Sequence, residues 1–327
     1  MNAGTRVLIT GGAGFIGSAL AAKLIHDGFD VMVVDDFVFD YDVPLGHDLL
    51  FNVSHRINHL LSGARIERCS LLEKERLGDI LNAYEPSCVI HLAAIPLVAV
   101  ATQRPEMAKA VLSDGLLNLL DVLRRSPTLR RFVFVSSSMV YGHFQTDMLS
   151  EDAPLNPINV YGALKLTGEI LSKSYLGPSA SDVVIVRPSA VYGPFDQHRR
   201  VLKKFLESAL AGRSIQLNAA NDHTMDFTYI NDAVHGLALA ATCPSAADQV
   251  FNITFGRGRS LTDLANIIRV HVPDLKTNGD QINDSDRPRR GGLSIKKART
   301  LLNYHPEWSL ERGVEAYLKH LRGSASI

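Results

Sequence analysis

Cysteine, net charge and long apolar runs are all scarce in this chain of 327 residues. The three cysteines form an odd, sparse set without metal-ligand spacing, which argues against a disulfide framework and against a metal site. The apolar run that begins at Val7 is broken at Gly11 and Gly12, too soon for an export signal or a membrane span. We therefore expect a reduced, cytoplasmic protein that holds no metal and has no membrane partner.

Lysine plus arginine and aspartate plus glutamate each number 34, so the formal net charge is zero. This balance lacks the basic surface of nucleic-acid-binding proteins, and we expect no nucleic-acid partner. One local basic cluster has two open interpretations, a solvated helix face or a phosphate contact. Its members are Arg199, Arg200, Lys203 and Lys204.

The first half of the chain alternates short, apolar, β-branched runs with segments of helical periodicity. Such runs are typical of fully buried parallel strands. They span residues 7–10, 31–34, 88–92, 132–136 and, further on, 183–186. The alternation predicts βαβ units and an α/β fold of Rossmann type, with a doubly wound parallel sheet.

After residue 193 the pattern loosens into shorter strands and helices, among them a run at 250–253. A chain of this length is typical of about two domains. We predict a Rossmann domain at residues 1–186 and a smaller domain formed mainly by residues 187–327. A segment near 226–242 is expected to return to the first domain.

A glycine-rich turn joins the first predicted strand to the first predicted helix. Gly11 permits the tight turn, Gly14 lets the backbone approach a pyrophosphate, and Gly17 allows close packing of helix on strand. The helix N-terminus then offers free N–H groups and partial positive charge to phosphate. The second predicted strand ends in Asp35 and Asp36, at the spacing of a carboxylate that binds ribose. Such a carboxylate accepts hydrogen bonds from the ribose of NAD and repels the 2′-phosphate of NADP.

Tyr161 and Lys165 lie four residues apart, so a helix places them on one face. A tyrosine phenol has a pKa of about 10, which a nearby cation lowers by about 1–3 units. Ser136, Ser137 and Ser138 lie at the end of the fourth predicted strand, where open α/β sheets bind ligands. A serine hydroxyl there can hold a substrate hydroxyl while Tyr161 takes its proton.

With these segments and others, the chain resembles the extended short-chain dehydrogenase/reductases. Within that family it is most similar to the NAD-dependent sugar-nucleotide epimerases and dehydratases, of the UDP-glucose 4-epimerase kind. The resemblance covers essentially the whole chain, with the segments in the family's order. They are TGGAGFIG from Thr10, HLAA from His91, SSSMVYG from Ser136, YGALK from Tyr161, RPSAVYGP from Arg187, DFTYINDA from Asp226 and SIKKARTLL from Ser294.

The resemblance implies a homodimeric enzyme whose first domain binds NAD and whose second domain binds a nucleotide sugar. It implies that Tyr161 is the catalytic acid and base, that Lys165 binds the nicotinamide ribose and lowers the tyrosine pKa, and that Ser137 completes the triad. The implied NAD site comprises Gly11, Gly14, Phe15, Ile16, Gly17, Asp35, Asp36, Ser70, Leu71, Leu92, Ala93, Ala94, Tyr161, Lys165, Pro188 and Ser189. The implied substrate site comprises Ser138, Met139, Tyr161, Ala190, Arg199, Arg200, Arg287 and Arg289, with Arg290 a further candidate for holding phosphate.

The chain departs from the family at four positions that bear on the reaction and the substrate. Family dehydratases usually carry Asp-Glu where this chain has Ser138 and Met139. Methionine cannot act as a base, so the departure favours epimerisation or simple redox chemistry over dehydration. Ala190 and Met225 stand where the family usually has residues that reach the substrate, which leaves the nucleotide and the sugar open.

Our leading hypothesis is an NAD-dependent epimerase of a nucleoside-diphosphate sugar, acting at C4 through a transient 4-keto intermediate. One alternative is a sugar-nucleotide 4-ketoreductase or dehydrogenase, and another is a dehydratase with a different base. A more distant alternative is a non-catalytic protein that senses NAD.

Overall fold

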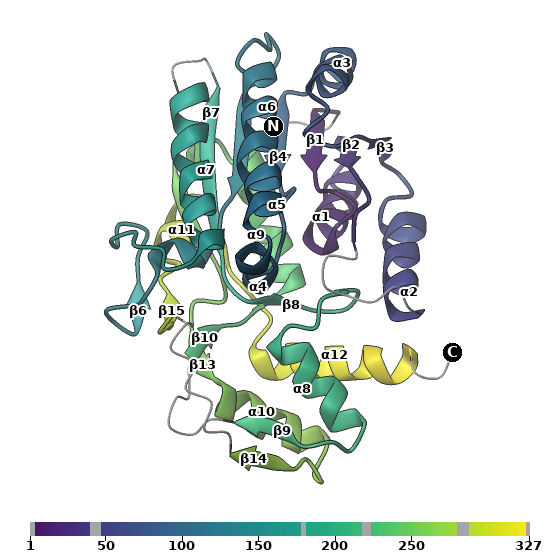
Figure 1. The fold of residues 1–327 in the computed structure, drawn as a ribbon, viewed down its shortest axis with the longest axis vertical. Helices are drawn as coiled ribbons and strands as arrows, with labels where there is room; N and C mark the ends of the chain where they lie inside the picture. The colour runs from purple at the N-terminus through teal and green to yellow at the C-terminus, as the bar shows by residue number, and fades with distance from the viewer. Residues whose placement is uncertain (1–3, 40–46, 178–180, 218–223, 280–287, 325–327) are drawn as a thin grey trace.

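The computed structural model describes the chain except residues 1–3, 40–46, 178–180, 218–223, 280–287 and 325–327. Its centre is a seven-stranded parallel sheet, in the order β12-β7-β5-β4-β1-β2-β3 (Figure 1). The strands are β1 (Arg6–Thr10), β2 (Asp30–Asp35), β3 (Arg65–Arg68), β4 (Cys88–His91), β5 (Arg131–Val135), β7 (Asp182–Pro188) and β12 (Val250–Ile253). All five predicted apolar runs lie in this sheet, which confirms the predicted Rossmann-type fold.

Helices cover both faces of the sheet because alternate strand residues point to opposite sides. In β1, Val7 and Ile9 join the core beneath helices α1 (Phe15–His26) and α9 (Ile230–Thr242). Leu8 joins a second core on the opposite face. The helices of that face are α3 (Lys74–Tyr84), α6 (Gly115–Leu123) and α7 (Val160–Leu176).

The strand β12 pairs in parallel with β7 at one edge of the sheet, although the sequence pattern placed residues 250–253 with the smaller domain. One part of the C-terminal region gathers below the sheet in Figure 1. Its main elements are α8 (Val201–Leu210), β9 (Ile215–Leu217), β10 (Thr224–Asp226), β13 (Gly258–Ser260), α10 (Leu261–His271), β14 (Thr277–Gly279) and α12 (Leu310–Ser324). The division into a cofactor domain and a substrate domain stays a prediction.

Shorter elements connect these layers. They are α2 (His47–His55), α4 (Val98–Gln103), α5 (Pro105–Lys109), β6 (Met148–Leu149), β8 (Val191–Tyr192), β11 (Thr228–Tyr229), β15 (Gly292–Leu293), α11 (Lys296–Leu302) and helical turns at Arg56–Leu60, Ala110–Asp114, Ser138–Tyr141 and Pro244–Ala246. Within the described part of the chain, no helix is long and apolar enough to cross a membrane.

Candidate cofactor and active site

Where β1 meets α1, two positions have room only for glycine. Gly11 has φ +68°, and a Cβ there would lie 2.5 Å from the Ala93 nitrogen. A Cβ on Gly17 would lie 2.4 Å from the Gly11 oxygen, so α1 packs directly on the turn. Gly14 is the N-cap of α1 and provides no side-chain cap, which leaves the first N–H groups of the helix available to a phosphate.

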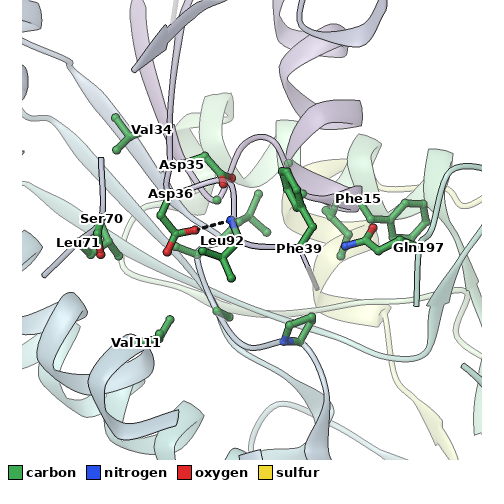
Figure 2. Close-up of a pocket in the computed structure, with 18 of the residues that line it drawn as sticks. Phe15, Val34, Asp35, Asp36, Phe39, Ser70, Leu71, Leu92, Val111 and Gln197 are labelled. Atoms are coloured by element: carbon green, nitrogen blue, oxygen red, sulfur yellow. Dashed lines mark hydrogen bonds between the residues drawn. The ribbon is translucent and has the colours of Figure 1, made fainter. Parts of the chain in front are cut away.

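A hollow of about 970 Å³, open to solvent, lies beside this turn. Figure 2 shows Ser70 and Leu71 on one side of it and Phe15 and Gln197 on the other. Twelve of the residues predicted to bind NAD line the hollow, namely Gly11, Gly14, Phe15, Ile16, Gly17, Asp35, Asp36, Ser70, Leu71, Leu92, Ala93 and Ala94. The remaining four, Tyr161, Lys165, Pro188 and Ser189, do not line it.

Asp35 is buried at the end of β2 and held by two backbone groups. Its Oδ2 accepts a hydrogen bond from the Ala13 N–H at 2.9 Å, and its Oδ1 accepts one from the Phe37 N–H at 2.8 Å. Burial raises the pKa of Asp35 to about 6, against these two hydrogen bonds, which lower it. The carboxylate is therefore the main form at neutral pH but not in mild acid. Neighbouring Asp36 accepts from the Val38 N–H at 3.1 Å (Figure 2).

Tyr161 and Lys165 lie on the first turns of α7, which begins where the Asn159 side chain accepts a hydrogen bond from the Gly162 N–H at 2.9 Å. The Lys165 ammonium donates to the Val135 carbonyl at 2.8 Å and lies 6.0 Å from the centre of the Tyr161 ring. Burial lowers the pKa of Lys165 to about 8. The structure thus brings the lysine to the end of β5, two residues before Ser137.

Ser137 and Tyr161 meet at this strand end. Burial raises the pKa of Tyr161, while the charge of Arg200 and a hydrogen bond with Ser137 lower it. From the sequence, we expected Lys165 to lower the pKa of Tyr161. The net shift within the protein is upward because desolvation of the phenolate outweighs the neighbouring charge. The phenol is therefore the resting form, and further positive charge is needed to favour the phenolate.

A buried polar network lies one helical turn behind Lys165 and was not predicted. Glu169 forms a bidentate ion pair with Arg187, at 2.9 and 2.7 Å, and also accepts a hydrogen bond from Ser136. Arg187 further donates to the Tyr141 hydroxyl at 3.0 Å. The spacing of Lys165 and Glu169, four residues apart on one helix, was the available signal. The network fixes the serine segment relative to α7.

The arginines that were predicted to bind the substrate lie in different parts of the structure. Arg199 is half exposed and pairs with Glu207 at 2.8 Å, as on a solvated helix face. Arg200 pairs with Asp196 and lines the hollow. Arg289 is 71% exposed, and Arg287 lies outside the described residues. Arg290 reaches the active site, where it donates hydrogen bonds to two serines.

Of the other substrate candidates, Ser138 and Met139 are buried beside Ser137, and Ala190 adopts φ +39° just after β7. Sequence reasoning missed nine residues that line the hollow. They are Val34, Val38, Phe39, Cys69, Leu72, Pro96, Val111, Gln197 and His198. Several of these follow strands already predicted, whereas Gln197 and His198 come from the distant loop after β8 and carry no local signal. No cluster of metal-binding side chains occurs among the residues that the structure describes.

Comparison with known proteins shows the family of this chain. The model of the NAD dependent epimerase/dehydratase family matches residues 7–254, so the chain belongs to that family of NAD-dependent enzymes. It is 30% identical to a Bacillus subtilis protein described as an uncharacterized UDP-glucose epimerase, over 97% of this chain and 98% of that one. It is 29% identical to the UDP-glucose 4-epimerase of Mycolicibacterium smegmatis, over 98% and 99% of the two chains.

Solved structures show the same likeness. The UDP-glucuronic acid 4-epimerase of Bacillus cereus, in complex with UDP-glucuronic acid and NAD, superimposes with a TM-score of 0.87 at 27% identity. The match covers 98% of this chain and 100% of that chain. The UDP-glucose 4-epimerase of Thermotoga maritima, with UDP-glucose, has a TM-score of 0.85 at 26% identity, with the same coverage.

Proposed function

We propose that this protein interconverts the C4 epimers of a UDP-linked hexose, with NAD as its resident cofactor. The observation that carries the proposal is the meeting of Ser137, Tyr161 and Lys165 at the end of β5, next to a hollow built for a dinucleotide. Relatives named as UDP-sugar 4-epimerases support the substrate class.

The residues of the hollow fit NAD. Because Gly11 and Gly17 have no side chains, the backbone of the turn and the N-terminus of α1 are free to hold the pyrophosphate. Asp35 presents a carboxylate for the adenosine ribose, a group that favours NAD over NADP. When bound, NAD takes a hydride from C4 of the sugar and later returns it.

The protein's own groups supply the proton transfers. Ser137 holds the C4 hydroxyl, and Tyr161 takes its proton as the C4–H bond breaks and the C4 carbonyl forms. The positive charges of Lys165 and Arg200 favour the phenolate that this step needs. When the opposite face of the keto sugar is presented, Tyr161 returns the proton to the C4 oxygen. No net oxidation results, so cofactor exchange is not required.

Met139 distinguishes this reaction from dehydration. It is buried beside Ser137 and has no exchangeable proton, so it cannot remove the C5 proton. The product formed in heavy water should therefore carry no deuterium at C5 and should keep its C6 substituent. Deuterium at C5, or loss of a C6 hydroxyl, would show a dehydratase with a base elsewhere.

The direct test is incubation of the NAD-loaded protein with UDP-sugars, followed by NMR of the products. The C4 epimer should form without stoichiometric NADH. Tyr161→Phe should retain NAD binding and lose about 10²–10⁴-fold in turnover. Tyr175→Phe, on the same helix but away from the site, is the matched control. Stoichiometric production or consumption of NADH would instead identify a dehydrogenase or 4-ketoreductase.

We further propose that the enzyme is a cytoplasmic homodimer that pairs through the outer face of α7. Ile170 on this helix is 58% exposed, and the three cysteines are free thiols. Light scattering should give a dimer for the wild type and a monomer for Ile170→Glu. Val270→Glu, at a 77% exposed position on α10, should stay dimeric. A monomeric wild type would contradict the proposal.

A further inference from the structure

Arg290 enters the active site from the segment before β15 and is firmly placed there. Its Nη2 donates to the Ser138 hydroxyl at 2.8 Å and to the Ser189 hydroxyl at 2.7 Å. Its carbonyl accepts a hydrogen bond from the Thr224 hydroxyl at 2.8 Å, and the Gly292 N–H donates to the Asp147 carbonyl at 2.8 Å. The guanidinium is thus anchored between the ends of β5 and β7.

This cation has no ion pair in the part of the chain that the structure describes. No carboxylate there lies within ion-pair distance of Arg290, and burial lowers its pKa to about 10. The negative charge of Asp226 raises the pKa of Arg290, but the Asp226 carboxylate is hydrogen-bonded to other residues. Its oxygens accept from Thr254, Gly256 and Leu293, and burial raises its pKa to about 7. A desolvated arginine without a full partner is costly, and an arriving anion would relieve that cost.

The position of Arg290 indicates which anion it can meet. Ser137 and Tyr161 mark the place of the reacting C4 atom, and Ser138, which holds Arg290, is the next residue after Ser137. In a hexose ring C5 is bonded to C4, whereas C1, which carries the diphosphate, lies across the ring. An arginine held by the residue next to Ser137 is therefore expected to lie closer to a substituent on C5 than to the diphosphate.

We propose that Arg290, held by Ser138 and Ser189, binds a carboxylate on C5 of the sugar, so that the preferred substrate is a nucleotide-linked hexuronic acid. This inference rests on the proposed function for the placement of C4. Arginine suits the role because Nη1 can donate charge-assisted hydrogen bonds to a carboxylate while Nη2 keeps its serine contacts. A neutral hexose with a C6 hydroxyl would leave the guanidinium without its anion.

The test compares UDP-glucuronate with UDP-glucose, which differ only at C6. In the wild type, kcat/KM should be at least about tenfold higher for UDP-glucuronate. Arg290→Gln should lower kcat/KM for UDP-glucuronate by about 10–150-fold, the range of a charged hydrogen bond, and should lower that for UDP-glucose by a smaller factor, so that the preference for UDP-glucuronate falls by about tenfold or more. Arg299→Gln on the exposed face of α11 is the matched control and should change neither.

A second measurement does not depend on turnover or on the folding of the Arg290 variant. The NAD-loaded Tyr161→Phe protein should bind UDP-glucuronate at least about tenfold more tightly than UDP-glucose by calorimetry. Equal affinities would overturn the inference. So would an equal loss for UDP-glucuronate, UDP-glucose and UDP in Arg290→Gln, because it would place the diphosphate on Arg290. If neither sugar is epimerised but the binding preference is found, the proposed function fails and the carboxylate site stands.

Discussion

Replacement of Lys165 by methionine should stabilise the protein at neutral pH while it abolishes turnover. Burial lowers the pKa of Lys165 from 10.5 to about 8, and each unit corresponds to about 1.4 kcal/mol, so the charged lysine costs about 3 kcal/mol at pH 7. Removal of this cost stabilises the variant, but loss of the hydrogen bond from Lys165 to the Val135 carbonyl destabilises it by about 1 kcal/mol. The net gain is about 2 kcal/mol. With an unfolding entropy of about 0.7 kcal/mol/K for 327 residues, Tm should rise by about 3 °C.

The gain should depend on pH with a defined sign. A lysine whose pKa is lowered by folding carries its full penalty below pH about 8, and the penalty fades as pH rises toward the unfolded pKa near 10.5. Calorimetric Tm values of Lys165→Met and wild type should therefore differ at pH 7 and nearly coincide at pH 9.5. Lys173→Met, at an exposed position on the same helix, should show no such pH dependence. A lower Tm for Lys165→Met at pH 7, or a difference unchanged by pH, would refute the reasoning.

Two further outcomes are expected. Because the pKa of Asp35 is raised to about 6, NAD affinity should weaken by about tenfold for each pH unit below 6, measured by calorimetry. Asp35→Asn should bind NAD more weakly and show no such slope, and a slope that survives would exclude Asp35 as its source. Arg187→Met leaves Glu169 buried and unpaired, which should cost about 3–5 kcal/mol and about 4–7 °C in Tm. A loss no larger than that of Arg76→Met, in a half-exposed pair, would contradict this account.

Local sequence patterns were sufficient for the sheet and the cofactor turn. The buried strands are continuous apolar runs, and the turn needs glycine for steric reasons that act within a few residues. Gly11 has φ +68°, and a Cβ on Gly17 would lie 2.4 Å from the Gly11 oxygen. Asp35 could be predicted because it ends a strand at a set distance from that turn. In each case the physical cause lies in the segment that carries the signal.

Contacts between distant segments left no such signal. Arg290 and Ser138 are 152 residues apart, and the pattern around Arg290 offered three arginines without a reason to choose one. Gln197 reaches the hollow from a loop whose path depends on the packing of the smaller region. The run at 250–253 is too short to show whether it belongs to the large sheet, since β12 joins it only at the edge.

Two buried cations and one half-buried cation near the active site differ in one respect that connects stability with function. Arg187 is neutralised by Glu169 and serves as part of the scaffold. Within the described residues, neither Lys165 nor Arg290 has a carboxylate at ion-pair distance, and both have a lowered pKa. Lys165 binds the Val135 carbonyl and Arg290 binds Ser138, so their contacts lie on either side of Ser137 along the chain. A sequence shaped only for stability would pair such charges or replace them with apolar groups. The presence of both cations beside the catalytic serine follows if their electrostatic partners appear only during the reaction: the phenolate form of Tyr161 for Lys165, and the substrate anion for Arg290.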